Sequence, residues 1–166
     1  MDDAAVGESF EDYVAGRGRA LLRFAYVLCR DHELAKDLVQ DALIKTHARW
    51  HKVDSPEAYV RRAIVNDFLS WKRRRASRDV VTDQLPETAV HPDHAEDRDA
   101  MWRVLATLPK QQRAVLVLRF YEGLDDDAIG RTLGCTAATV RSHASKALAT
   151  LRAGDASTRY AEGSAR

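Results

Sequence analysis

The chain has few residues that interrupt regular structure, and it has no long apolar run. Its 166 residues include four prolines and eight glycines, and neither type is gathered into a low-complexity tract. Stretches that alternate apolar and polar residues, as half-buried strands do, are almost absent. No apolar run approaches the roughly 18–20 residues that a membrane-spanning helix needs. We therefore predict an all-α protein with no contact to a membrane.

Cysteine is also scarce. Cys29 and Cys135 lie far apart in the chain and form neither a disulfide framework nor a paired metal-binding motif. Residues 1–12 hold five acids and no apolar stretch, which is unlike a secretory signal. These absences predict a cytoplasmic protein whose two cysteines pack as small apolar residues.

Motifs of catalysis and of metal binding are missing too. The sequence contains no nucleophile elbow, no phosphate-binding glycine loop and no zinc-protease helix motif. Two histidine pairs have a helical spacing, but no third ligand follows at a suitable distance; the pairs are His47 with His51 and His91 with His94. We therefore expect no enzyme activity, no metal and no cofactor.

Charge is strongly patterned along the chain, although the net charge is only +1. Residues 61–78 hold seven bases and one acid, residues 79–100 hold seven acids and one base, and residues 101–152 hold eight bases and four acids. Two basic segments around an acidic one favour a polyanionic partner that is contacted at two places. Solvated helix faces are the alternative interpretation.

The length suits one ordinary domain or two very small ones, and the pattern of the chain favours two. We place the first helical domain at residues 1–78 and the second at residues 97–154. Residues 79–96 lose helical periodicity and hold two prolines, which predicts a flexible acidic linker. The small and polar residues of 155–166 predict a disordered tail.

Helical periodicity places the main elements of both domains. In the first domain we expect helices over residues 10–30, from about 34 to 50, and from 56 to about 76, the last one starting at Ser55 as cap and Pro56 as first residue. In the second domain Leu105 and Leu108 mark one helix, and the next is marked by Ala114, Val115, Leu118 and Phe120.

The sharpest pattern is a helix-turn-helix over Asp125 to Leu151. Three acids begin a short helix, where the helix dipole favours negative charge, and Gly134 permits the tight turn. The second helix buries Val140, Ala144 and Leu148. Its opposite face carries short hydroxyls and bases that suit base edges and phosphates; these residues are Thr139, Arg141, Ser142, Ser145 and Lys146. A plain helical hairpin with a polar face is the alternative.

Two patterns in the first domain are weaker alone. Asp37, Gln40, Asp41 and Lys45 share the outer face of a helix, which is either a docking face or a solvated one. The run from Lys72 to Arg75 ends a helix that also presents Arg62 and Asn66, and cations beside aromatic rings can hold single-stranded nucleic acid. Such a run is also common at solvated helix ends.

Taken in order, these pieces resemble a bacterial RNA polymerase sigma factor of the extracytoplasmic-function group, over about residues 10–153. The stretch Asp37–Asp41 is similar to the family's helix that docks on core polymerase. Residues 56–75 resemble the helix that melts and reads the minus-ten promoter element, and the loop 53–57 resembles the loop that captures a base. Residues 108–113 and 139–142 are similar to the module that reads the minus-thirty-five element.

The resemblance implies partners and site residues. The partners are core RNA polymerase, promoter DNA in duplex and single-stranded form, and an anti-sigma factor. The core-binding residues are Asp37, Leu38, Gln40 and Asp41. The residues for the minus-ten element are Asp54, Ser55, Arg62, Asn66, Arg73 and Arg74. Those for the minus-thirty-five element are Thr139, Arg141, Ser142, His143, Ser145 and Lys146.

The sequence departs from the family at two of these positions. His143 and Lys146 stand where relatives often carry arginine, and lysine does not replace arginine in two-point contacts with guanine. A changed upstream preference is therefore expected. The rival interpretation is a free-standing transcriptional regulator with the same C-terminal motif, but such a protein has no use for the face at Asp37–Asp41 or for that at Arg62 and Asn66.

Overall fold

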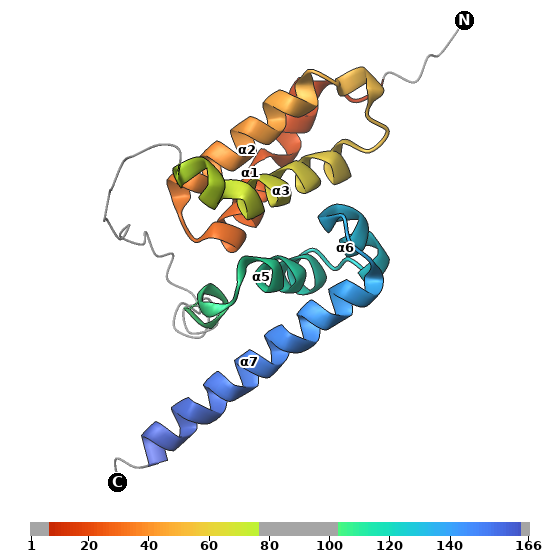
Figure 1. Ribbon diagram of the computed structural model, residues 1–166. Helices are drawn as coiled ribbons and strands as arrows, with labels where there is room; N and C mark the ends of the chain where they lie inside the picture. Colours follow the sequence, from red (N-terminus) through yellow and green to blue (C-terminus); the bar gives the residue numbers. More distant parts are fainter. Residues whose placement is uncertain (1–6, 77–102, 164–166) are drawn as a thin grey trace, which may run out of the picture. The chain divides into compact units, whose positions relative to one another are not determined.

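A computed structural model describes residues 7–76 and 103–163, with side chains described for 7–71 and 103–154. Every regular element in these ranges is helical, which confirms the predicted all-α fold (Figure 1). The elements are α1 (Phe10–Cys29), α2 (His32–His47), the 3-10 helix η1 (Trp50–Lys52), α3 (Pro56–Ala76), α5 (Lys110–Leu116), the π-helical turn η2 (Val117–Tyr121), α6 (Asp126–Leu133) and α7 (Ala137–Gly163). Contacts between Cα atoms divide the chain into two compact units, Met1–Ile64 and Val65–Arg166. None of the described helices is long and apolar enough to cross a membrane.

The first unit is built on the pairing of α1 with α2 (Figure 1). Ser9 caps α1 by accepting a hydrogen bond from the Asp12 amide at 3.1 Å, and Asp31 caps α2 through the Leu34 amide at 3.0 Å. Between the two helices the chain turns at Arg30, whose φ of 59° ends α1 in the left-handed region. The predicted stripe of α1 is buried as expected; it consists of Leu21, Phe24, Ala25 and Leu28.

The end of α2 differs from the prediction, while the start of α3 agrees with it. α2 stops at His47 rather than near Trp50, because the Trp50 ring packs against the rings of Phe10 and Tyr13 at 5.4 and 5.5 Å between centroids. This tertiary contact outweighs the local helical periodicity. α3 begins at Pro56, and the Tyr59 amide donates to the Ser55 carbonyl at 3.1 Å.

In the second unit, α7 packs against α5 and α6 (Figure 1). The helix before α5 covers residues 103–107, and the Arg113 guanidinium reaches back to its end and donates to the carbonyls of Leu105, Ala106 and Leu108 at 3.0–3.2 Å. Arg113 therefore satisfies acceptors that a helix end leaves open. Arg113, the last residue of the motif at 108–113, thus has a structural role.

Phe120, one of the residues that mark this helix in the sequence, is 68% exposed. It lies within η2, in which the Glu122 amide donates to the Val117 carbonyl, five residues back, at 3.1 Å. A π-helical turn of this kind departs from α-helical spacing. Ala114, Val115 and Leu118 of the same stretch are buried.

The tail also differs from the expectation. α7 does not end near Leu151 but continues to Gly163, through most of the segment predicted to be disordered. Residues 152–163 contain three alanines and no proline, so no proline interrupts the helix. The predicted acidic linker at 79–96 lies outside the described residues.

Candidate nucleic-acid and polymerase interfaces

The helix-turn-helix forms as the sequence predicts. Asp125 caps α6 by accepting from the Ala128 amide at 2.7 Å, and Gly134, with a φ of 70°, ends the helix in the left-handed region. The chain then turns into α7, where Thr136 accepts a hydrogen bond from the Thr139 amide at 3.2 Å. Both helices are therefore capped by side chains, which satisfy backbone amides at the helix starts.

Gly130 is a second glycine that the turn requires, and the sequence analysis did not single it out. A Cβ atom at this position would lie 2.6 Å from the Cys135 carbonyl oxygen, which is closer than real Cβ contacts come. The Cys135 amide in turn donates to the Gly130 carbonyl at 3.0 Å. α6 and the turn thus touch backbone to backbone. The available sequence signal was a glycine inside an otherwise good helix.

The polar face of α7 lies opposite its buried face. Val140, Ala144 and Ala147 are buried, and Leu148 packs partly buried against the cluster of Leu108, Leu116 and Ala147. Most of the predicted upstream-element residues are exposed; these are Thr139, Arg141, Ser142, Ser145 and Lys146. His143 is half-buried. The Thr139 hydroxyl lies 3.0 Å from the Thr136 hydroxyl and forms part of the cap of α7.

One carboxylate joins three elements beneath this face. Asp126, the first residue of α6, forms an ion pair with Arg119 of η2 through its Oδ1 atom. Its Oδ2 atom lies 3.7 Å from Nη1 of Arg141 on α7. Residue spacing does not predict this group, because its three members lie on three different elements.

The predicted core-binding residues of α2 divide into two sets. Asp37, Gln40 and Asp41 are exposed on one face. Leu38 is only 4% exposed, so the proposal that it touches a partner needs correcting. Its side chain is turned inward as part of the buried stripe of α2, and it supports the face from behind.

An apolar groove adjoins this face. It has a volume of about 710 Å³ and runs between α1 and α2, with Gln40 and Lys36 among its polar lining residues. Its apolar lining consists of Phe10, Val14, Leu22, Val39, Leu43 and Ile44. Leu22 and Ile44 are exposed, the latter by 62%. Large exposed apolar side chains beside a polar rim are typical of protein-binding surfaces.

The predicted minus-ten residues lie on α3 and on the loop before it. Asp54 and Ser55 are exposed in the loop, and Arg62 and Asn66 are exposed one helical turn apart on α3. Arg73 and Arg74 belong to the helical backbone of α3, but their side chains lie outside the described residues.

Glu57 ties the start of α3 to α1. The buried Tyr13 hydroxyl donates to Glu57 Oε2 at 2.9 Å, and Arg17 donates to both carboxylate oxygens at 2.5 and 3.1 Å. Arg61 adds a longer contact of 3.5 Å from within α3. Because the loop 53–55 leads directly into this turn, the cluster fixes the point from which the loop departs.

The charges of this cluster shift two pKa values. Burial, and then the hydrogen bond to Glu57, raise the pKa of Tyr13 far above its ordinary value. Burial also acts to raise the pKa of Glu57, but the hydrogen bonds from Arg17 and Tyr13 and the charges of Arg17 and Arg61 outweigh it, so this pKa lies below its ordinary value. Glu57 is therefore an ionised acceptor at neutral pH.

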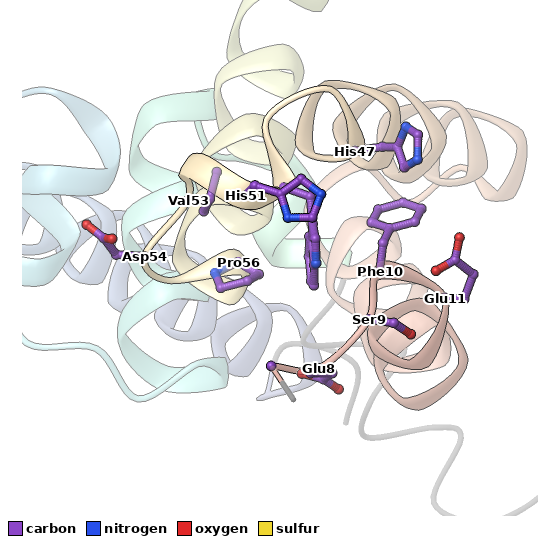
Figure 2. A pocket seen from close by; sticks show the side chains of 11 residues that line it. Glu8, Ser9, Phe10, Glu11, His47, His51, Val53, Asp54 and Pro56 are labelled. Atoms are coloured by element: carbon purple, nitrogen blue, oxygen red, sulfur yellow. The ribbon is translucent and has the colours of Figure 1, made fainter. Parts of the chain in front are cut away.

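A second hollow lies beside the same loop. It has a volume of about 870 Å³ and is open to solvent between the start of α1 and the segment that joins α2 to α3 (Figure 2). The His47 ring meets the Phe10 ring edge to face, with 4.8 Å between centroids. His51 projects over the middle of the hollow, and Asp54 lies at its far edge with its carboxylate directed away from the rings (Figure 2). The hollow thus combines aromatic rings with the acidic side chains of Glu8, Glu11 and Asp54.

Comparison with known proteins adds to this geometry. The family described as sigma-70 region 2 matches residues 14–78, and that described as sigma-70 region 4 matches residues 98–151. An RNA polymerase sigma-E factor of Streptomyces coelicolor is 40% identical over 149 residues, which is 86% of this chain and 84% of the relative. An ECF RNA polymerase sigma factor, SigE of Mycolicibacterium smegmatis, is 30% identical over 84% of this chain and 59% of the relative.

A solved structure agrees with these matches. The sigma factor RpoE of Bartonella quintana, determined in complex with the anti-sigma factor NepR, superimposes with a TM-score of 0.70 at 27% identity, over 86% of this chain and 94% of that one. The region 2 match includes the exposed residues of α3, and the region 4 match includes the exposed residues from 139 to 146 of α7. The chain therefore belongs to the RNA polymerase sigma factors of the sigma-70 family, in the extracytoplasmic-function group, which direct RNA polymerase to promoters.

Proposed function

We propose that this sigma factor grips its promoter at two points while it is bound to core RNA polymerase through α2. The face formed by Asp37, Gln40 and Asp41, together with the groove beside it, docks on the polymerase. The chain is a specificity subunit and not an enzyme, because the energy for melting the promoter comes from binding within the holoenzyme. It acts in the cytoplasm, where polymerase and DNA meet.

The observation that carries this proposal is the apolar groove next to Gln40. A free-standing regulator needs a DNA-reading helix but has no use for a second exposed surface with Ile44 at its edge. An amphipathic helix of a partner fits such a groove by burying apolar side chains while the polar rim sets its register. Gln40 in the lining of the groove and Asp41, exposed on the same face of α2, supply hydrogen-bond and charge partners.

Downstream, we propose that α3 and the preceding loop read the minus-ten element as a single strand. Arg62 and Asn66 share one exposed stripe of α3, where they can contact phosphate and base. The hollow beside Asp54 is lined by the rings of Phe10, His47 and Trp50, and an unpaired base can stack on such rings. A base turned out of the duplex costs a few kcal/mol of lost stacking, which these contacts must offset.

Upstream, we propose that α7 enters the major groove of the minus-thirty-five element as duplex. Its exposed residues from Thr139 to Lys146 form a polar strip above a buried apolar face, as a recognition helix requires. We further propose that an anti-sigma factor binds this chain, as NepR forms a complex with RpoE of Bartonella quintana. We assign residues 1–78 to the binding of core polymerase and the minus-ten element. We assign residues 97–154 to the binding of the minus-thirty-five element.

Binding to core polymerase tests the proposal. The full chain should co-purify with core polymerase, and Ile44→Asp should weaken this binding by about 10-fold or more, since it places a charge in an apolar contact. Asn66→Ala is the matched control on an exposed face of α3; it should leave core binding unchanged and weaken minus-ten recognition. Failure of the unaltered chain to bind core polymerase would favour the free-standing regulator.

A further inference from the structure

The Asp126 carboxylate lies beside Arg141 of the helix that we propose to read duplex DNA. Its Oδ1 atom is held by Arg119, and both of these side chains are about three-quarters buried. Its Oδ2 atom faces the Arg141 guanidinium at 3.7 Å, whereas the Arg141 side chain is 62% exposed. One oxygen is therefore anchored in the scaffold, and the other is presented to a side chain that reaches into solvent.

This arrangement restricts Arg141. A free arginine side chain samples many rotamers and meets a DNA phosphate as readily as a base. A guanidinium carries five N–H donors in a planar fork, so one edge can pair with a fixed carboxylate while others remain for a second partner. Because Arg119 holds the carboxylate, the position of Asp126 on α6 sets the direction in which the Arg141 fork can point.

We propose that Asp126 is a positioning residue that fixes Arg141 for contact with a guanine edge in the upstream element. The inference rests on the proposed entry of α7 into the major groove. Guanine offers the two acceptors that an arginine fork matches. The carboxylate also repels phosphates and lowers the affinity for DNA of any sequence. Asp126 thus lowers the affinity for DNA of any sequence and increases the discrimination between bases.

A purely structural role for Asp126 makes a different prediction. An acid in the first turn of α6 also stabilises that helix through the helix dipole. If this were its only role, removing the charge would weaken binding to all DNA sequences together. If Asp126 positions Arg141, discrimination at one base pair falls while binding to unrelated DNA rises.

The test uses holoenzyme assembled from core polymerase and the full chain. Wild-type holoenzyme first selects its upstream element from a random duplex library. The selected fragment and its single-base variants are then bound by holoenzymes that carry Asp126→Asn, Arg141→Ala or both substitutions. Asp127→Asn is the matched control, since it removes a neighbouring acid in the same turn of α6.

We expect Asp126→Asn to reduce discrimination at one guanine position by about two- to fivefold, the range of a partly exposed ion pair. Its affinity for unrelated DNA should be higher than that of the wild type. That affinity should also decrease more steeply as the salt concentration rises, with a slope larger by up to about 0.9 for one added phosphate contact. Arg141→Ala should lose discrimination at the same position, and the double variant should lose no more. Asp127→Asn should leave discrimination at this position unchanged.

Two outcomes would overturn the inference, and they are distinguishable. If wild-type holoenzyme selects a defined upstream element and Asp126→Asn reads it with unchanged discrimination, or with a uniform loss at every base, the positioning role is wrong and the proposed function stands. If wild-type holoenzyme selects no upstream element, the proposed role of α7 fails and the inference fails with it.

Discussion

The cluster that joins α1 to the start of α3 permits a quantitative prediction. Tyr13→Phe removes a buried hydroxyl that donates to the Glu57 carboxylate at 2.9 Å. Hydrogen bonds to charged groups contribute about 1.5–3 kcal/mol. Because Arg17 and Arg61 still satisfy the carboxylate in the variant, we expect a cost near the lower end, about 1–2 kcal/mol.

Glu57→Ala should cost more, because it leaves the Tyr13 hydroxyl buried without its acceptor. The orphaned hydroxyl costs about 1–3 kcal/mol. The lost pairs with Arg17 and Arg61 add about 0.2–1 kcal/mol each, since both are partly exposed. The expected total is about 2–4 kcal/mol. In the double variant the hydroxyl and the carboxylate are both absent. Its cost in free energy should therefore be about 1–2 kcal/mol smaller than the sum of the costs of the two single variants.

Amide hydrogen exchange measures these costs in the intact chain. Peptides from α1 and from the first turns of α3 report the local opening free energy, and peptides from α6 serve as an internal reference. An unfolding midpoint for the whole chain is less suitable, because a chain of two units need not unfold in one step. Additive costs for Tyr13→Phe and Glu57→Ala, within about 0.5 kcal/mol, would refute the coupling.

Three further predictions concern stability and the recognition helix. Gly130→Val should destabilise the second unit by about 2 kcal/mol or more, because the added atoms meet the Cys135 carbonyl, whereas Gly16→Val, with nothing within 4 Å, should cost about 1 kcal/mol or less; amide exchange in α6 and in α1 measures the two costs, and equal costs would contradict the packing argument. Asp125→Ala should cost about 1 kcal/mol by removing the cap of α6, to be measured as faster amide exchange in that helix, and unchanged exchange would count against the cap. Since the pKa of Glu57 is lowered on folding, its stabilisation should be complete above the unfolded pKa of about 4.3 and disappear as the pH falls through the lower folded value; in acid titrations the stability gap to Glu57→Gln should close over that window, and a constant gap would contradict it.

Local chemistry explains why much of the fold was predictable. Ser55 and Pro56 mark the start of α3 because a helix start needs a cap and tolerates proline, and Gly134 marks the turn because its backbone is left-handed. The exposed set on α7 followed from the spacing of Val140 and Ala144, since helical geometry places the remaining residues opposite.

The features that sequence reasoning missed depend on contacts between distant residues. α2 ends early because Trp50 packs on α1. Phe120 is exposed and lies within a π-helical turn, which residue spacing does not predict. The Asp126 carboxylate could not be assigned to Arg119 and Arg141 from spacing alone. Leu38 belongs to the predicted core-binding motif, but its burial, which spacing does not give, separates it from the exposed residues of that motif.

The measurement that tests the central claim most directly is run-off transcription with purified core polymerase on promoter fragments selected by the holoenzyme. The account predicts a transcript with one defined start only when the full chain is present, and its loss when either the upstream or the minus-ten element is replaced. Equal transcription without the chain, or transcription that survives replacement of both elements, would contradict the two-point promoter grip.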